Sequence, residues 1–318
     1  MNLLPAMAHS GGRCGGAVIM PRIYTTSFRV HHYDLDAFGE LRASTFARLL
    51  QQAATEASAD AGFDDAWYAR AGAFWLIRRT TIEYHRPVQA WDTVRVNTWV
   101  ADFRRVRSQR EYEMYVEGAT EPVARGHTDW VYVERGTFKP RRVPQEIIDG
   151  LMPDGLGPPL DRPPWADGDE PGEAFSTTRT VEFRDLDGLA HVNNASYLDY
   201  VEETAYAASA ASGWPLERVL DLGGCWRPRF HDIEYLAEAL YGDVLSCASW
   251  VSRCAGPELE RRTEIRRQGD GARLARARSR WAWVTRPDRR RADIPAPLAT
   301  ALLSSGSSSN GDGGGRRA

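Results

Sequence analysis

The sequence predicts an α+β protein built from two tandem copies of one unit, each an antiparallel sheet curled around a long central helix. In both halves of the 318-residue chain, one long helical segment precedes four strand-like runs. A single offset of 151 residues aligns much of the two halves without gaps, so that Asp36 meets Asp187 and the Ile-Glu-Tyr segment 82–84 meets the identical segment 233–235. Residues 153–172, rich in proline and glycine, separate the copies. One register kept across several elements indicates a duplicated fold.

The first copy shows its elements in a clear order. Residues 28–35 have the polarity of a strand, and residues 43–61 place apolar side chains on one helical face until Gly62 ends the helix. The strand-like runs that follow are 73–84, 93–103, 108–116 and 122–134.

The second copy repeats this order. Residues 178–183 are β-branched and aromatic, as in a strand, and Tyr197 and Val201 lie on the apolar face of a helix predicted over 195–211. The strands expected to follow are 229–238, 243–252, 259–267 and 272–285. One strand, a long helix and four more antiparallel strands is the order of a hotdog unit, so the predicted fold is a tandem (double) hotdog.

These patterns divide the chain into five parts. Met20 is a candidate for the true start, and the last residues are rich in serine and glycine. The predicted parts are a disordered or mis-annotated N-terminus at 1–21, an N-terminal hotdog at 22–150, a linker at 151–174, a C-terminal hotdog at 175–297 and a disordered tail at 298–318.

Composition excludes several classes of protein. A net charge of −3 argues against a general nucleic-acid binder, and no apolar stretch is long enough to span a membrane. The four cysteines form no CxxC pair and have no histidine at ligand spacing, which favours a reduced cytosol over a disulfide framework or a metal site. The first 20 residues do not have the pattern of a signal peptide. We therefore expect a cytoplasmic protein without a metal or another cofactor.

The chemistry is concentrated in residues 184–194, between the strand and the helix of the second copy. This stretch holds Asp187, His191 and two amides, Asn193 and Asn194. A helix start has unpaired N–H groups and a partial positive charge, which can polarise a carbonyl group. An acid and an imidazole beside such a helix start point to acyl hydrolysis.

The pattern Asp-Leu-Asp-x-x-x-His-Val-Asn-Asn-x-x-Tyr, residues 185–197, resembles the C-terminal hotdog of acyl-acyl-carrier-protein (acyl-ACP) thioesterases of bacteria and plant plastids. The resemblance covers roughly residues 22–290 and implies a double hotdog whose catalytic residues lie in the second unit. It places the family's catalytic acid on Asp187, its histidine on His191 and its later glutamate on Glu238. Two positions depart from the family, because Leu189 stands where it has asparagine and Ala239 where it has cysteine.

The internal repeat supports the same division of labour. Under the offset of 151, His191 aligns with Glu40, Asn193 with Arg42 and Tyr197 with Phe46. The acid is present in both copies, but the histidine and both amides occur only in the second. The first copy is therefore expected to shape the acyl pocket.

The predicted mechanism is hydrolysis by an activated water. Asp187 or Glu238 orients or deprotonates the water, and N–H groups at the start of the 194–211 helix stabilise the oxyanion. His191 positions the thioester or helps the thiolate leave, while Asn193, Asn194 and Tyr197 are candidate substrate-binding residues.

Simpler interpretations exist for the same residues. An aspartate or asparagine before a helix is often a cap or turn residue, and a glutamate on a strand usually faces solvent. The arginine groups 104–107, 261–267 and 276–280 suit a carrier protein or coenzyme A phosphates, or form an Arg-biased solvated surface.

The expected activity is hydrolysis of acyl-ACP to free fatty acid and holo-carrier protein, a reaction of fatty acid biosynthesis. One alternative is an acyl-coenzyme A thioesterase of the same fold, and another is a non-catalytic acyl-thioester-binding protein, which Leu189 favours. The expected partner is the carrier protein or coenzyme A, as part of the substrate. A tandem fusion supplies in one chain what single hotdogs obtain by dimerising, so both a monomer and a homodimer fit.

Overall fold

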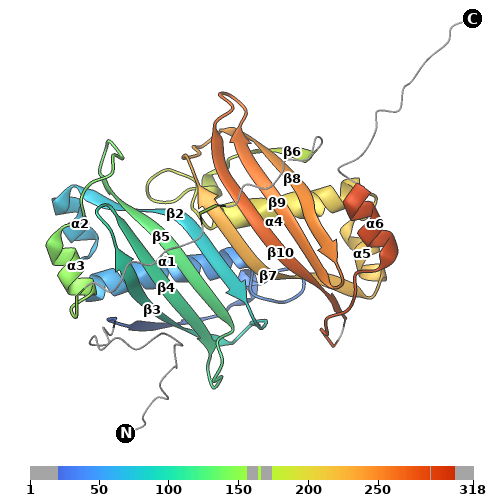
Figure 1. The fold of residues 1–318 in the computed structure, drawn as a ribbon, viewed down its shortest axis with the longest axis horizontal. Coiled ribbons are helices and arrows are strands. Elements are labelled where there is room, and N and C mark those ends of the chain that lie inside the picture. Colours follow the sequence, from blue (N-terminus) through green and yellow to red (C-terminus); the bar gives the residue numbers. More distant parts are fainter. Residues whose placement is uncertain (1–20, 156–163, 166–173, 287, 305–318) are drawn as a thin grey trace, which may run out of the picture.

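A single antiparallel sheet of ten strands runs through both halves of the chain. The computed structural model describes residues 21–155, 164–165, 174–286 and 288–304. Within them the strand order is β1-β3-β4-β5-β2-β7-β10-β9-β8-β6, and the two long helices α1 and α4 lie on the same face of the sheet (Figure 1). This arrangement confirms the predicted double hotdog.

The elements of the two halves correspond one to one. The first half contains β1 (Tyr24–Arg29), η1 (His32–Asp34), α1 (Ala43–Asp60), α2 (Asp65–Ala71), β2 (Ala73–Tyr84), β3 (Thr93–Phe103), β4 (Arg107–Val116), β5 (Ala124–Glu134) and α3 (Gln145–Leu151). The second contains β6 (Phe175–Thr180), η2 (Phe183–Asp185), α4 (Ser196–Ala211), α5 (Leu216–Asp221), β7 (Gly224–Tyr235), β8 (Val244–Ala255), β9 (Glu258–Arg267), β10 (Arg273–Thr285) and α6 (Ala296–Ser304). Shifting β1, η1, β2 and β4 by 151 residues gives the bounds of β6, η2, β7 and β9.

The central strand pair β2–β7 joins the halves. The two strands are antiparallel, with Arg79 opposite Glu234 and Glu83 opposite Phe230. Across this pair, Arg79 donates from Nε and Nη2 to the two carboxylate oxygens of the buried Asp232, each at 2.7 Å. A bidentate pair of this kind fixes the register of the two halves.

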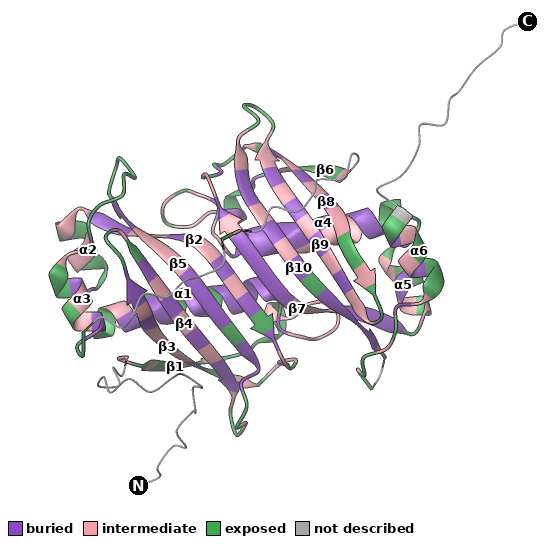
Figure 2. Cartoon of the chain, in the orientation of Figure 1, coloured by how far each residue is buried: buried purple, intermediate pink, exposed green. Residues whose placement is uncertain are grey.

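The long helices pack on the sheet through small and apolar side chains. On α1, the buried positions include Phe46, Leu50, Ala53 and Ala57, which recur at three- and four-residue spacing (Figure 2). Gly126 on β5 lies directly beneath Leu50, and a Cβ at this position would lie 2.7 Å from the leucine Cδ1. The absence of a side chain here lets the helix approach the sheet closely.

Several predicted boundaries were wrong. The first strand of each copy ends earlier than predicted, because Asp34 and Asp185 accept hydrogen bonds from the N–H groups of His31 and Glu182, both at 2.9 Å, and close a 3₁₀ turn. Likewise β7 covers 224–235 and not 229–238, so Glu238 lies beyond the strand.

The end of the second hotdog also needs correction. Residues 298–304, predicted as part of a disordered tail, belong to α6, where Leu298 and Leu302 are buried against the second half. Their four-residue spacing is that of one helical face. At the other junction, the predicted linker begins inside α3, since Leu151 is its last residue and is buried. The predictions for 1–20 and 305–318, and for most of the linker, fall outside the described residues.

Candidate active site

The predicted catalytic stretch forms a tight loop between η2 and α4. The Asp187 N–H donates to the His191 carbonyl at 2.9 Å, and the Leu189 N–H donates to Asp187 Oδ1 at 2.8 Å. Ala190 adopts a left-handed φ of 60°, which lets the chain reverse within four residues. The loop therefore fixes one carboxylate oxygen of Asp187.

Three side chains of this loop contact the first half. Leu189 lines a cavity there. The His191 ring packs on Phe138, with ring centroids 5.3 Å apart. Asn193 Nδ2 donates to Gln51 Oε1 on α1 at 3.4 Å. The candidate site is thus composite, with a loop from the second half set against α1 and the β5–α3 connection of the first.

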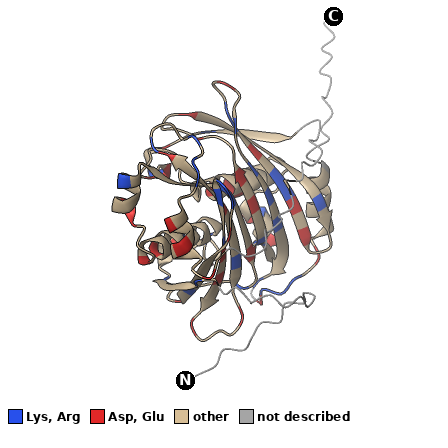
Figure 3. Cartoon of the chain, turned by 60° about the vertical axis from the view of Figure 1, so that its left-hand side comes forward, with Lys and Arg blue, Asp and Glu red and all other residues tan. Residues whose placement is uncertain are grey.

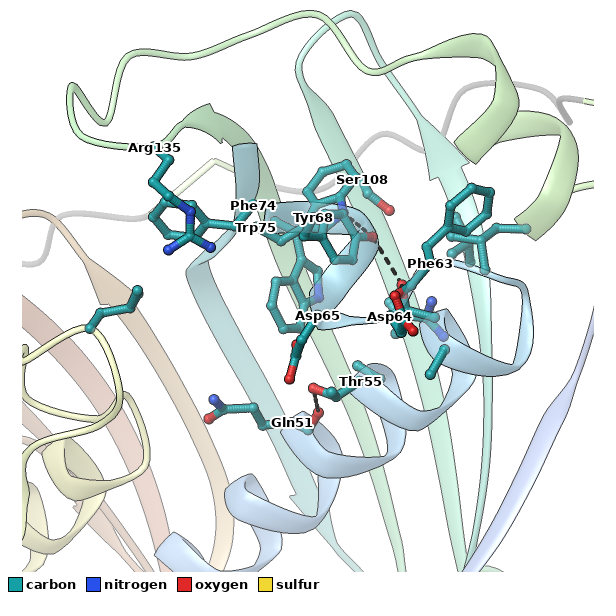
Figure 4. A pocket seen from close by; sticks show the side chains of 18 residues that line it. Gln51, Thr55, Phe63, Asp64, Asp65, Tyr68, Phe74, Trp75, Ser108 and Arg135 are labelled. Carbon is teal, nitrogen blue, oxygen red and sulfur yellow. Dashed lines mark hydrogen bonds between the residues drawn. The ribbon is translucent and has the colours of Figure 1, made fainter. Parts of the chain in front are cut away.

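The cavity has a volume of about 400 Å³ and lies in the first half, between α1, α2 and the inner face of the sheet (Figure 4). Its apolar lining includes Ala54, Phe63, Phe74, Val100 and Leu151. Among its lining residues Leu189 alone comes from the second half. A hydrocarbon chain can therefore enter the first half from the loop that carries Asp187 and His191.

The matching space in the second half is almost filled. It measures about 20 Å³ and is lined by Tyr206 and Leu259, which occupy the positions of Thr55 and Ser108 in the first half. The larger side chains close the space against the buried aromatic cluster of that half. Only one of the two related sites has room for an acyl chain.

The other predicted residues have different surroundings. Glu238 is exposed, and its backbone carbonyl accepts from Arg267 Nη2 at 2.9 Å. The loop that carries it does pair with the catalytic loop, since the Val192 N–H donates to the Ala239 carbonyl at 2.9 Å. Its side chain nevertheless lies at the surface.

Tyr197 and Asn194 support the loop from below. Tyr197 is 2% exposed and packs among Tyr200 and Tyr235, where burial raises its pKa. Tyr235 in turn donates from its hydroxyl to the Asn194 carbonyl at 3.0 Å. Both residues are thereby placed in the packing beneath the loop, and neither lines the cavity.

Asn193 closes the turn before α4. Its Oδ1 accepts from the Ala195 N–H at 2.9 Å, and its carbonyl accepts from the Ser196 N–H at 2.9 Å. The Leu198 N–H donates to the Ala195 carbonyl at 3.0 Å. Three N–H groups at the start of the helix are therefore already engaged, and these three do not provide the expected oxyanion donors.

Gln51 is a site residue that the sequence did not reveal. Figure 4 shows its side chain reaching from α1 toward the second half, where its amide meets Asn193 and the cavity. Gln51 is half-buried beside the apolar face of α1, where the sequence pattern predicts a solvent-exposed side chain. Its alignment with Glu202 is the one signal in the sequence, because the offset pairs an amide with an acid there.

The halves meet at two places that the 151-residue offset relates: the first seam, at Asp187 and His191, and the second seam, at Asp36 and Glu40. Charged side chains fill the second seam. Glu40, at the position of His191, pairs with Arg227 at 2.7 Å and with Arg289 at 2.6 Å. Arg289 has the same left-handed backbone as its counterpart Phe138. Beside them, burial raises the pKa of Asp36, and burial with the nearby Asp199 raises the pKa of Glu202 to about 8. This seam is an ion-pair cluster.

The arginine groups are largely ion-paired. Arg276 pairs with Glu234 at 2.7 Å, and Arg104 pairs with Asp102 at 2.8 Å. Figure 3 shows acidic and basic residues interleaved along the strands. This pairing is that of a solvated, mixed-charge sheet face.

The described residues contain no cluster of histidine, cysteine or acidic side chains able to hold a metal ion. In the same part of the chain, no helix has the length and apolarity needed to cross a bilayer.

Two family models match the chain, one in each half. The acyl-ACP thioesterase N-terminal domain matches residues 21–151, and a thioesterase-like superfamily matches residues 181–302. Together they span most of the sequence. The first half thus resembles acyl-ACP thioesterases, and the second half resembles a broader thioesterase superfamily. The chain is a thioester hydrolase.

Individual relatives are distant. A palmitoyl-acyl carrier protein thioesterase of Arabidopsis thaliana is 22% identical over 279 residues, covering 83% of this chain and 65% of the plant protein. An uncharacterised protein of Mycobacterium tuberculosis is 28% identical over 186 residues, covering 57% of this chain and 69% of its own. For a palmitoyl-acyl carrier protein thioesterase of Cuphea hookeriana, the match spans 57% of this chain and 46% of the plant enzyme. The match thus covers about half the length of that plant relative.

Solved structures agree on the fold. The 12:0-ACP thioesterase of Umbellularia californica superposes with a TM-score of 0.67 at 19% identity, over 82% of this chain and 94% of that one. An acyl-ACP thioesterase of Bacteroides thetaiotaomicron gives 0.64 at 20% identity, over 81% and 97%. At these identities the likeness establishes the double hotdog.

Proposed function

We propose that this thioesterase hydrolyses an acyl-ACP thioester to a free fatty acid and the holo-carrier. The observation that carries the proposal is the composite site, in which the Asp187–His191 loop of the second half meets a cavity of about 400 Å³ in the first. The acyl chain lies in that cavity, and the thioester lies beside Leu189. The pantetheine arm and the carrier remain outside.

Asp187 is the group that acts on water. Its Oδ1 is held by the Leu189 N–H, which leaves Oδ2 to accept a proton from water. The water oxygen attacks the thioester carbon, its proton passes to Asp187, and the carbon–sulfur bond breaks to give the acid and a thiolate. The exposed position of Glu238 favours Asp187 over Glu238 for this step.

Gln51 supplies the amide that Leu189 lacks. Gln51 Oε1 accepts from Asn193, so its Nε2 remains a donor at the mouth of the cavity. A donor there can stabilise the oxyanion, a role the engaged N–H groups of α4 do not fill. His191, held against Phe138, then positions the thioester or donates toward the departing sulfur.

The test is thiol release from matched thioesters. One acyl chain is presented on acyl carrier protein and on coenzyme A, to the wild type and to Asp187→Ala. The proposal predicts turnover that favours the carrier-protein thioester and that Asp187→Ala abolishes. A preference for coenzyme A identifies the other thioesterase activity. Stoichiometric uptake without thiol release would contradict hydrolysis and identify an acyl-binding protein.

A further inference from the structure

A buried arginine lies within the acyl cavity. Arg110, on β4, is 6% exposed and lines the cavity. Its Nη1 donates to Thr98 Oγ1 at 3.3 Å, and that hydroxyl donates in turn to the Glu111 carbonyl at 2.9 Å. Among the residues that the structure describes, no carboxylate forms an ion pair with Arg110. Burial lowers the pKa of the guanidinium, which nonetheless stays protonated near neutral pH.

The neighbouring polar groups satisfy one another. The Tyr68 hydroxyl lies 2.9 Å from Ser58 Oγ and accepts from Trp75 Nε1 at 3.0 Å. A guanidinium has five N–H donors, so Arg110 has most of its hydrogen-bonding capacity available to a group in the cavity. Burial of this cation costs solvation free energy, which an anion in the cavity would offset.

The second half has an equivalent arginine with almost no cavity beside it. Arg261 occupies the corresponding position on β9 and is also buried, with its pKa lowered by burial to about 10. There Tyr206, Leu259 and Leu302 leave about 20 Å³. Only the guanidinium of the first half faces a space that can hold a ligand.

We propose that the cavity takes an acyl chain that carries a second oxygen function, a carboxylate, beyond its thioester, and that Arg110 pairs with it. This inference rests on the proposed function and names its substrate class. The span of α1 along the cavity, from Gln51 at the loop to Ser58 beside Tyr68, is roughly 10 Å at 1.5 Å per residue. A medium-length chain bridges that span, with its thioester at Leu189 and its carboxylate at Arg110.

The test compares thioesters of equal chain length that differ at the far end, one unsubstituted and one ending in a carboxylate. The wild type should favour the carboxylate-ended substrate in kcat/KM by about 10-fold or more. Arg110→Met should reverse this preference while still hydrolysing the unsubstituted thioester. Arg261→Met, the matched change without a cavity, should keep the wild-type preference. A wild type that prefers the unsubstituted chain, or an Arg110→Met variant that slows both substrates equally, overturns the inference.

A separate binding measurement distinguishes this inference from the proposed function. Trp75 and Trp130 line the cavity, so their fluorescence reports occupancy. Titration with matched monocarboxylic and dicarboxylic acids should show tighter binding of the dicarboxylic acid, lost in Arg110→Met and partly kept in Arg110→Lys. If no thioester is hydrolysed but this pattern holds, the proposed function fails and the ligand class stands. Equal binding of both acids by a folded wild type contradicts the ligand class directly.

Discussion

The two seams between the halves share one loop conformation, but the first borders a cavity and the second is occupied by ion pairs. At the first, the loop that holds Asp187 and His191 contacts Gln51 through Asn193 and lines a cavity of about 400 Å³ through Leu189. At the second, Asp36 and Glu40 form the same turn. The Asp36 N–H donates to the Glu40 carbonyl, as the Asp187 N–H donates to the His191 carbonyl. A few side chains separate an open site from a closed one, which shows how a duplicated fold can keep one site and turn the other into an interface.

Removal of each acid in turn should give the largest difference between the two seams. Asp187→Asn should lower kcat by roughly 10³-fold, the scale of a lost general base. Asp36→Asn should leave kcat within about twofold, because Asn Oδ1 can still accept from the Phe38 and Glu40 N–H groups. Steady-state thiol release by the two variants measures the contrast. Equal losses in both would mean that both seams are catalytic.

The second seam should contribute to stability. Glu40→Gln breaks two ion pairs of a carboxylate whose side chain is 14% exposed, and should lower the free energy of unfolding by about 2 kcal/mol. The control Glu258→Gln removes an exposed pair with Arg291 and should cost about 0.5 kcal/mol or less. Urea denaturation followed by circular dichroism compares them. Equal costs would show that the second seam has no special role.

Gln51 lines the cavity at the first seam. Gln51→Leu removes the amide at the cavity mouth and should lower kcat/KM by about 10-fold, the effect of one lost hydrogen bond to a charged transition state. Its counterpart Glu202→Gln should not lower kcat/KM. An unchanged rate in Gln51→Leu would exclude the amide from catalysis.

Glu202 also predicts a difference in pH dependence. Its carboxyl has a pKa of about 8 in the folded chain against an ordinary value of 4.5, so folding favours the protonated form. The chain should therefore lose stability as pH rises from about 4.5 to 8. Glu202→Gln should raise Tm by a few degrees at pH 8.5, reflecting about 1 kcal/mol after solvent screening, and leave Tm unchanged at pH 5. Thermal scans of the wild type and Glu202→Gln at the two pH values measure the difference. An equal difference in Tm between the two proteins at pH 5 and pH 8.5 would contradict this prediction.

The features that the sequence predicted correctly are those that show as a repeat or as a periodic pattern of apolar residues. The offset of 151 located two copies of one fold, and the helical and strand periods located the two long helices and most of the sheet. The short helices α2, α3, α5 and α6 were missed because each presents too few residues for a period to show. Their burial depends on tertiary contacts, as at Leu298 and Leu302.

The site was predicted only as far as one loop. Asp187, His191, Asn193 and Asn194 are close in sequence, and the structure keeps them on that loop. Gln51, Phe138 and Arg110 join the site across the seam or the sheet, and no local pattern reveals such neighbours. The family resemblance predicted Glu238 on a strand of the second half. That strand, β7, ends at Tyr235, and the Glu238 side chain lies at the surface.

In the proposed function, the first half holds the acyl chain and the second half cleaves the thioester. Filling the cavity tests this directly: the double variant Thr55→Tyr with Ser108→Leu gives the first half the two larger side chains found in the second. The filled variant should fold, still hydrolyse an acetyl thioester and lose most of its turnover of medium-chain thioesters, whereas the reverse change, Tyr206→Thr with Leu259→Ser, should leave medium-chain turnover unaltered. Medium-chain hydrolysis at the wild-type rate by the filled variant would instead show that the acyl chain lies outside this cavity.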